Sequence, residues 1–392
     1  MVLLENRDAC TGCGACANVC PKKAIFLLPD ERGFYYPQLD ADRCIDCGLC
    51  KRVCLIGRKK ELETPDFSVE VYAAYAKDDF IRRQSSSGGV FSILALEILR
   101  QGGIVYGAAF DENFNVTHIG VRTEEDLAKL RGSKYVQSFI SDTLYREIKQ
   151  ELENGVSVLF SGTPCQVAGL KLFLQKSYSN LLLVDLICHG VPSPKVFSEY
   201  LKDLEKKYGK ITSYKFRDKH RSWKWPNVEF YTSDDCHRIY YGLDSFINLF
   251  NKSTVRNSCY QCEFANSERI SDLTIGDFWK YKSSETMPDD DRGMSCVLCN
   301  SAKGTKFFLE LPKALFFEKR KLEEVEAGNP RLLSPREQVL NNFWPLFLTL
   351  GFHGIKKKFC SVSLRSRLGL WLRIGCPWLY NFLRNIWGII KK

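Results

Sequence analysis

Eight of the seventeen cysteines form two runs near the start of the chain, and both runs have the same spacing. The first run is Cys10, Cys13, Cys16 and Cys20, and the second is Cys44, Cys47, Cys50 and Cys54. A C-x-x-C-x-x-C loop wraps one 4Fe–4S cubane and offers it three thiolates, while the fourth cysteine reaches the other cubane. The spacing therefore predicts one cluster on Cys10, Cys13, Cys16 and Cys54, and a second on Cys44, Cys47, Cys50 and Cys20.

Two other uses of these cysteines fit the spacing less well. A zinc site commonly draws its four ligands from two C-x-x-C pairs, whereas each run here is a triplet with a trailing cysteine. A disulfide framework is typical of small secreted domains, and the first residues lack the charged and apolar regions of a secretory signal. We therefore expect residues 1–60 to form an α+β, ferredoxin-like module with two clusters, followed by a charged linker at 59–66.

Two more cysteines follow apolar segments in the second third of the chain. Residues 156–174 contain an apolar run, the loop Ser161 to Pro164 and a helical segment that starts near Cys165. Residues 181–194 repeat this design, with an apolar run that ends at Cys188. Strands without polar alternation, separated by helices, are typical of a parallel sheet buried on both faces, where ligands bind beyond the carboxyl ends of the strands. We expect Cys165 and Cys188 at such a site, with the thiol pKa of Cys165 lowered by the helix N-terminus.

Cys259 and Cys262 form a further C-x-x-C pair, and Cys165 with Cys188 would complete the four ligands of a third cluster. A single pair is weak evidence, because redox-active pairs and zinc sites use the same spacing. Cys296 and Cys299 compete for this role. They lie on an expected strand, where residues three apart face opposite sides, so we do not expect both to reach one cluster.

Two loops have the composition of anion-binding sites. Ser85 to Gly89 precede a segment, residues 91–99, whose apolar positions have helical spacing, and unpaired N–H groups at a helix N-terminus attract negative charge. The alternative is an ordinary serine cap. Arg131 to Lys134 form a small basic loop after an expected strand pair at 104–110 and 116–122, and a solvated loop is the equal alternative.

The net charge of +10 is concentrated at one end, because residues 341–392 hold five lysines and four arginines without an acidic residue. The rest of the chain has too little excess charge to favour nucleic-acid binding. No stretch is apolar enough to span a membrane, and we expect a cytoplasmic protein. Residues 379–390 have an apolar helical stripe, which predicts either peripheral contact with an anionic membrane surface or a helix docked on protein.

Several motifs recur in a specific order along the body of the chain. They are SSSGGVFS, RGSKYVQS, FSGTPCQVAGL, ICHGVPSP, FRDK, CYQCEFAN and SDLTIGDFW. From about residue 70 to about residue 335, this order resembles the beta-subunit family of coenzyme F420 hydrogenases and dehydrogenases. The resemblance implies a mixed α/β domain that binds FAD and a 4Fe–4S cluster, after the fused dicluster ferredoxin module. We therefore expect the chain after the module to have three parts. The first, residues 68–150, would bind flavin. The second, residues 151–335, would bind flavin and an iron–sulfur cluster, and the third is a basic amphipathic tail at residues 336–392.

The same resemblance assigns site residues. It implies flavin contacts at Ser87, Gly88, Gly89, Gly132, Ser133, Lys134 and Tyr135, and cluster ligands at Cys165, Cys188, Cys259 and Cys262. It does not identify catalytic residues that contact the electron acceptor. Lys215, Arg217 and Lys219 are candidates for binding an anionic substrate, with structural ion pairs as the alternative.

The resemblance implies an iron–sulfur flavoprotein oxidoreductase. Electrons would pass between the ferredoxin-type clusters and FAD, by way of the third cluster, and then by hydride transfer to a two-electron acceptor, coenzyme F420 or another small molecule. A redox partner protein or a ferredoxin would exchange electrons with the module. The alternative functions are a non-catalytic electron-transfer subunit that feeds a partner enzyme, and an iron–sulfur structural or regulatory module without flavin.

Overall fold

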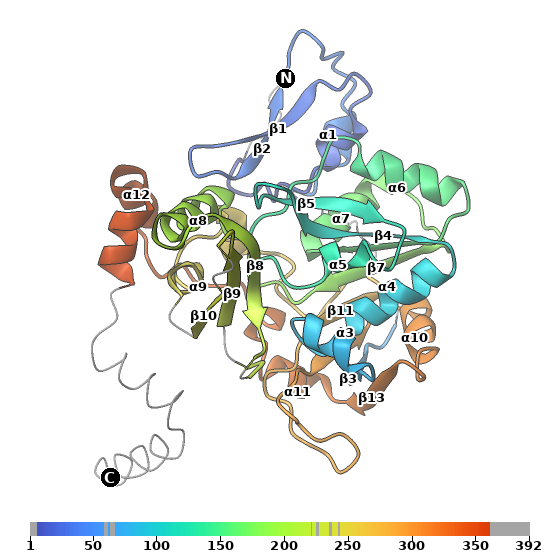
Figure 1. Ribbon diagram of the computed structural model, residues 1–392. Coiled ribbons are helices and arrows are strands. Elements are labelled where there is room, and N and C mark those ends of the chain that lie inside the picture. The colour runs from blue at the N-terminus through green and yellow to red at the C-terminus, as the bar shows by residue number, and fades with distance from the viewer. Residues whose placement is uncertain are drawn as a thin grey trace.

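The computed structural model describes residues 6–58, 62, 67–220, 222–224, 227–234, 237–241 and 244–360 (Figure 1). The N-terminal module contains two short helices, α1 (Ala15–Val19) and α2 (Leu49–Arg52), and one antiparallel hairpin, β1 (Ile25–Pro29) with β2 (Tyr35–Leu39). Each helix lies within one cysteine run and contains its third cysteine, Cys16 or Cys50, and the hairpin joins the two runs.

The rest of the chain is organised around one mixed sheet of eight strands in the order β13-β3-β12-β11-β7-β6-β4-β5. Its strands are β3 (Glu70–Ala76), β4 (Ile104–Phe110), β5 (Val116–Val121), β6 (Val158–Gly162), β7 (Leu181–Leu186), β11 (Leu273–Asp277), β12 (Ser295–Cys299) and β13 (Leu315–Arg320). The central strands β4, β6, β7 and β11 are parallel to one another, and the outer pairings are antiparallel. The parallel arrangement expected for 156–188 is confirmed, and strands from both halves of the chain share this sheet.

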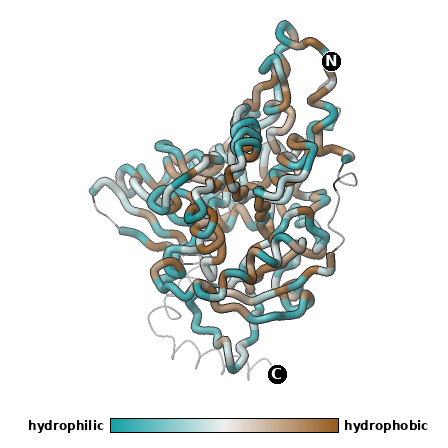
Figure 2. The backbone as a smooth tube through the Cα atoms, turned by 90° about the vertical axis from the view of Figure 1, so that its right-hand side faces the viewer, coloured by the Kyte–Doolittle hydropathy of each residue, from teal (hydrophilic) through white to brown (hydrophobic). Residues whose placement is uncertain are grey.

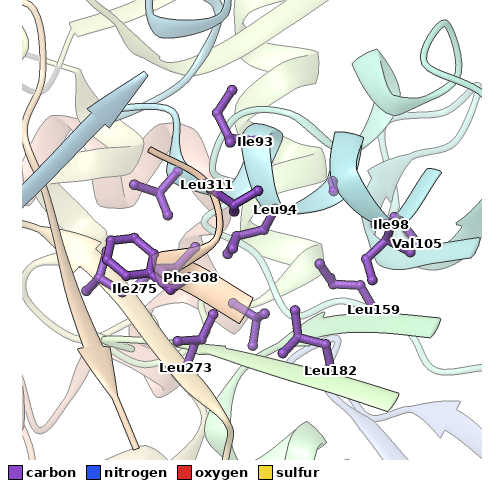
Figure 3. Close-up of a cluster of buried hydrophobic side chains, with 14 of the residues drawn as sticks. Ile93, Leu94, Ile98, Val105, Leu159, Leu182, Leu273, Ile275, Phe308 and Leu311 are labelled. Carbon is purple, nitrogen blue, oxygen red and sulfur yellow. The ribbon is translucent and has the colours of Figure 1, made fainter. Parts of the chain in front are cut away.

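Helices cover both faces of this sheet. One face packs on α4 (Val90–Arg100) and α10 (Ala302–Leu309), where Leu94, Phe308 and Leu159 meet in the core (Figure 3). The other face packs on α6 (Leu144–Glu153) and α7 (Pro164–Leu174). All five residues of β6 are buried, because the strand has helices on both sides, and this explains its uninterrupted apolar run.

A second layer of structure lies beside the large sheet. The three-stranded sheet β10-β9-β8 packs with α8 (Pro194–Tyr208) and α9 (Ser245–Phe250) around aromatic side chains that include Phe197 and Phe216. Its strands are β8 (Ile211–Asp218), β9 (Asn227–Thr232) and β10 (His237–Tyr241). The remaining elements are α3 (Asp79–Gln84), α5 (Leu127–Leu130), η2 (Asn257–Gln261), α11 (Leu322–Glu326), η3 (Pro330–Leu332) and α12 (Phe343–Phe359).

The first part of the basic tail, which forms α12, packs against α8 of the same chain. Lys356 of α12 forms an ion pair of 2.7 Å with Asp203 of α8, and the backbone N–H of Phe352 donates to Glu199 at 3.0 Å. The stripe expected at 379–390 lies outside the described residues. In the part of the chain that is described, no helix is both long enough and apolar enough to cross a membrane.

The N-terminal module projects from the body of the molecule but is anchored to it at its base (Figure 2). The side chain of Asn18, which is fully buried, donates to Ser141 O at 2.8 Å and accepts from Tyr145 N at 2.9 Å. The hairpin turn forms a second contact, where Lys195 of α8 donates to Glu31 O at 2.9 Å. These and further hydrogen bonds to the Cys10 loop give the module a fixed orientation relative to the large sheet.

Candidate functional site

The structure gathers the eight N-terminal cysteines around two cavities. The first is lined by Cys10, Cys13, Cys16 and Cys54, together with Cys50 from the other run. The second is lined by Cys20, Cys44, Cys47 and Cys50. Both trailing cysteines therefore lie with the loop of the opposite run, which is the arrangement that a crossed dicluster ferredoxin requires. The assignment of individual ligands remains a prediction.

The crossing can be tested by removing one trailing cysteine at a time. We expect Cys20→Ala to impair the cluster of the Cys44 loop, because Cys20 lines that cavity and not the other. Cys54→Ala is the matched variant and should impair the cluster of the Cys10 loop. Electron paramagnetic resonance of the anaerobically reconstituted variants would distinguish the two signals. Loss of the Cys10-loop signal alone in Cys20→Ala would contradict the crossing.

A third group of thiols forms where three segments meet. Cys165 lies in the first turn of α7, Cys188 follows β7, and Cys259 and Cys262 lie in and just after η2. Burial raises the pKa of Cys188 well above its usual value, and the neighbouring thiols of Cys259, Cys165 and Cys262 raise it further. These four side chains are therefore close enough to interact electrostatically, although they come from well-separated parts of the sequence.

One expectation about this group is wrong. Burial raises the pKa of Cys165 to about 12, so the position at a helix N-terminus does not lower it. Desolvation of a thiolate in this interior outweighs the attraction of the helix dipole. Cys259 shows the same effect, since burial raises its pKa to about 11. Four neighbouring buried thiols are stable as thiolates only beside a strongly cationic group, and the irons of a cluster would supply this charge. The donor set therefore fits a 4Fe–4S cluster.

The Cys10 loop packs closely against α7, the helix that carries Cys165, so the first and third groups of cysteines are neighbours. A Cβ atom added at Gly169 of α7 would lie 2.8 Å from Cys13 Cβ and 2.9 Å from Cys13 Sγ. The charge of Cys165 also raises the pKa of Cys13, after burial as the main cause. Gly169 thus allows the Cys10 loop to approach the helix that carries Cys165.

The competing pair, Cys296 and Cys299, does not join any of these groups. Both are fully buried in β12, and they belong to cores on opposite faces of the sheet. This confirms that they face opposite sides. No two cysteines within the described residues form a disulfide bond.

A cavity of about 500 Å³ lies at the carboxyl ends of β6 and β7, within the usual size range of cofactor sites. Its wall includes Ser87, Gly89, Gly132, Ser133, Lys134 and Tyr135, which are six of the seven residues expected to contact flavin. Cys188 also lines the wall. The cavity therefore adjoins the third cysteine group directly.

One end of the cavity is suited to phosphate. The first residues of α4 line it, and the N-cap of this helix is Gly89, which lies in the left-handed region with φ 89° and provides no side-chain cap. The backbone N–H of Ser133 donates to Ser86 Oγ at 2.8 Å and so joins the two loops. Arg131 Nε is buried in the same wall with no hydrogen-bond partner among the described residues. Unpaired helix N–H groups, hydroxyls and cations are the donors that a pyrophosphate requires, so this end fits FAD.

Gly88 is the seventh expected flavin contact, and it is not part of the wall. A Cβ atom at this position would lie 2.4 Å from Ala74 O and 2.9 Å from Ser295 N. Its own N–H donates to Ser295 Oγ at 3.0 Å, and its carbonyl accepts from Ala76 N at 2.7 Å. Gly88 therefore positions the serine loop against β3 and β12.

The other end of the cavity is aromatic and carries a buried ion pair. Arg217 forms a 2.9 Å ion pair with Asp277, and its guanidinium lies 4.8 Å from the ring centroid of Trp279. Tyr135 stacks on Phe250, with ring centroids 5.7 Å apart. Aromatic side chains of this kind can enclose a planar ring system.

The sequence did not single out His118, which also lines the cavity. Its ring nitrogens lie 2.8 Å from Ser138 Oγ and 3.0 Å from Ser161 O, and burial lowers the pKa of the imidazole to about 4. His118 is therefore neutral and fixed at neutral pH. A histidine on an alternating strand gives no sequence signal of such a position.

The two lysines proposed for an anionic substrate lie elsewhere. Lys215 forms a 2.7 Å ion pair with Glu229. Lys219 donates to the carbonyls of Ser87 at 2.7 Å and Arg292 at 2.9 Å. Neither lines the cavity. Lys215 has the structural ion-pair role that was the alternative, and Lys219 is held by backbone carbonyls, whereas Arg217 is both an ion-pair partner and part of the wall.

Comparisons with protein families match most of the chain. Residues 71–144 match the N-terminal part, and residues 155–325 the C-terminal part, of the coenzyme F420 hydrogenase/dehydrogenase beta subunit. Residues 9–57 match a 4Fe-4S dicluster domain. The protein thus consists of a ferredoxin-type 4Fe–4S domain followed by a mixed α/β domain.

Two relatives are similar at 25% identity. One is a subunit of the F(420)H(2) dehydrogenase of Methanosarcina mazei, which aligns over 211 residues, 50% of this chain and 59% of that protein. The other is the coenzyme F420-dependent sulfite reductase of Methanocaldococcus jannaschii, which aligns over 389 residues, 94% of this chain and 58% of that protein. The chain therefore spans somewhat less than three fifths of the length of these relatives. A structure from xenon derivatization of the F420-reducing NiFe hydrogenase complex of Methanosarcina barkeri has a TM-score of 0.44 at 18% identity, over 74% of this chain and 90% of that one.

Proposed function

Because the chain belongs to the coenzyme F420 hydrogenase/dehydrogenase beta-subunit family, an oxidoreductase family, we propose that it is an iron–sulfur flavoprotein. In this proposal it passes electrons between its ferredoxin-type clusters and FAD, and by hydride transfer to a small two-electron acceptor. The observation that carries the proposal is the position of Cys188, which belongs both to the third thiol group and to the wall of the large cavity.

The residues that would hold FAD divide by chemistry. The serine loop, the N-terminus of α4 and the loop from Arg131 to Lys134 would bind the pyrophosphate. The aromatic end with Tyr135, Phe250 and Trp279 would enclose the ring system. Bound FAD would supply the exchange between one-electron and two-electron chemistry, which iron–sulfur clusters alone do not provide.

The wall between these ends is largely apolar and would keep water away from the bound ring. Val90, Phe91, Leu130, Ile187 and Ile247 contribute to it. Exclusion of water protects a hydride-transfer site from competing reactions. The Arg217–Asp277 ion pair would then fix a dipole at the edge of the cavity at no cost of reorganisation.

The third cluster would be held by Cys165, Cys188, Cys259 and Cys262, and the other two by the N-terminal cysteines. Tyr145 supports this region, because its hydroxyl lies 2.7 Å from Cys13 O and 3.1 Å from Gln166 O and donates its one hydrogen between these two carbonyls. It thereby ties the Cys10 loop to α7, the helix that carries Cys165. The chain's own role is to keep the thiol groups and the cavity in fixed contact.

The names of both relatives contain F420, and one also contains sulfite reductase. F420 is therefore the first acceptor to test. The experiment is anaerobic purification with flavin and iron analysis, followed by a screen of two-electron acceptors. Bound FAD with turnover by the isolated chain would support the proposal. FAD without turnover would favour an electron-transfer subunit in a larger complex, and absence of flavin after reconstitution would exclude both.

Lys134 gives the flavin assignment a pH signature. Its ammonium donates to Lys129 O and Arg131 O, both at 2.9 Å, and burial lowers its pKa to about 7. A phosphate favours the charged lysine, so FAD affinity should fall by up to about tenfold per pH unit as pH rises above 7. Quenching of FAD fluorescence at pH 6, 7.5 and 9 would measure this. We expect Lys134→Met to remove the pH dependence and Lys215→Met to retain it, whereas unchanged wild-type affinity across this range would refute the contact.

A further inference from the structure

Arg256 is a fully buried arginine, and the hydrogen bonds of its guanidinium go to neutral oxygen atoms. Its Nε donates to Cys10 O at 2.6 Å, and its Nη1 donates to Tyr35 O at 3.0 Å and more weakly to Gln137 Oε1 at 3.5 Å. Nη2 is buried with no hydrogen-bond partner among the described residues. A buried cation without a paired anion costs several kcal/mol, so a charge in its surroundings must compensate it.

The position of Arg256 in the chain identifies that charge. Its backbone N–H donates to Val191 O at 3.1 Å, just after Cys188, and its own carbonyl accepts from Cys259 N at 3.0 Å. The backbone therefore belongs to the third cysteine group, while the side chain reaches the backbone of Cys10 in the first. Arg256 connects two sets of thiols that would be anionic when they bind iron.

The electrostatics agree with this position. Burial is the main influence on the thiols of Cys165 and Cys259 and raises the pKa of both, and the charge of Arg256 opposes this rise in each. The guanidinium also lies 3.9 Å from the ring centroid of Tyr36 and 5.8 Å from that of Phe34. These rings exclude water from the cation, so its field reaches the thiols with little screening.

We propose that Arg256 is a positioning residue that fixes the Cys10 loop against the Cys259 loop, and that its buried charge favours the reduced, more negative state of the iron–sulfur groups held there. The proposal for the Cys10 loop depends only on the dicluster domain, and the proposal for the Cys259 loop also rests on the third cluster of the proposed function. A cation at fixed distance stabilises the state with the additional electron, as it stabilises a carboxylate over a carboxylic acid.

The test is a redox titration of the reconstituted full-length protein, followed by electron paramagnetic resonance. In Arg256→Gln, which keeps hydrogen-bonding capacity but removes the charge, reduction of the Cys10-loop cluster should become about tenfold less favourable, equal to 59 mV for one electron. Arg256→Lys keeps the charge and should shift the equilibrium by less than about threefold. The cluster of the Cys44 loop serves as an internal reference, because the hydrogen bonds of the Arg256 side chain go to Cys10, Tyr35 and Gln137 and to no cysteine of that loop.

Arg7→Gln is a matched control, because Arg7 lies over the same Tyr36 ring at 4.4 Å but its side chain is 57% exposed. Water screens its charge, so no shift is expected. An unchanged equilibrium in Arg256→Gln, with iron content retained, would overturn the charge effect. Equal shifts in the glutamine and lysine variants, or loss of the Cys10-loop cluster in both, would also overturn it and leave Arg256 a scaffold residue only.

Iron and flavin analysis of the same preparations separates this inference from the proposed function. A wild-type protein that saturates near about eight irons and binds no flavin would refute the proposed function. The Arg256 effect would still be measurable on the Cys10-loop cluster in that protein. Conversely, full iron and flavin content with no shift in any Arg256 variant would leave the function standing and remove the inference.

Discussion

Cys259→Ser is expected to lower the iron content of the reconstituted protein from about twelve to about eight per chain, because one of three cubanes loses a ligand. Both N-terminal clusters should remain reducible, since Cys259 lines neither of their cavities. FAD should still bind, because the phosphate end of the cavity is formed by other segments. Flavin reduction through the N-terminal module should then slow by at least about a hundredfold, which corresponds to an activation free energy that is higher by roughly 2.7 kcal/mol.

The control is Cys360→Ser, which replaces a half-buried thiol at the end of α12, away from the three groups. It should retain about twelve irons and normal flavin reduction. Stopped-flow absorbance after mixing with a reduced donor ferredoxin would measure the rate. Normal flavin reduction in Cys259→Ser would show that electrons do not pass through this group. Unfolding with release of FAD would instead indicate a structural metal site.

Gly88→Ala is expected to weaken FAD binding by about a hundredfold or more, although Gly88 does not line the cavity. The new Cβ would lie 2.4 Å from Ala74 O and 2.9 Å from Ser295 N, and both are backbone atoms of the large sheet. Because the sheet cannot move, the serine loop must move instead. Ser87 and the first turn of α4 would leave the phosphate end, and overpacking of this kind also costs about 1–3 kcal/mol of stability.

Gly102→Ala is a matched control just beyond the other end of α4. Gly102 has a positive φ of 72°, and a Cβ atom there would meet nothing within 4 Å. It should lose about 1 kcal/mol of stability from backbone strain while keeping FAD affinity. Equilibrium titration with FAD and denaturant unfolding would separate the two effects. Equal FAD affinity in Gly88→Ala and wild type would contradict the location of the phosphate end.

Local patterns predicted much of this fold. Spacing alone predicted the crossed grouping of the N-terminal cysteines around two cavities, and apolar runs identified β6 and β7. These predictions succeed because loop geometry and strand burial are properties of short segments. The sequence did not reveal β1 or α3, which are short and lack a complete pattern.

Long-range packing explains what the sequence could not supply. Nothing around Arg256 in the sequence indicates that its side chain reaches a carbonyl 246 residues earlier. The high pKa of Cys165 likewise depends on burial by distant segments, which overrides the local effect of the helix N-terminus. The role of Gly88 depends on its contacts with the backbone atoms of β3 and β12, and these two strands become neighbours only in the assembled sheet.

The position of β3 between β12 and β13 imposes an order on how the protein is made. β3 leaves the ribosome with the first part of the chain, yet both of its neighbours in the sheet come more than 200 residues later. At translation rates of about 5–20 residues per second, β3 waits about 10 to 45 s before β12 has been synthesised. Both of its edges stay unpaired for this time and are open to wrong partners. The cysteine loops are complete much earlier, so iron insertion into the N-terminal module could precede closure of the large sheet.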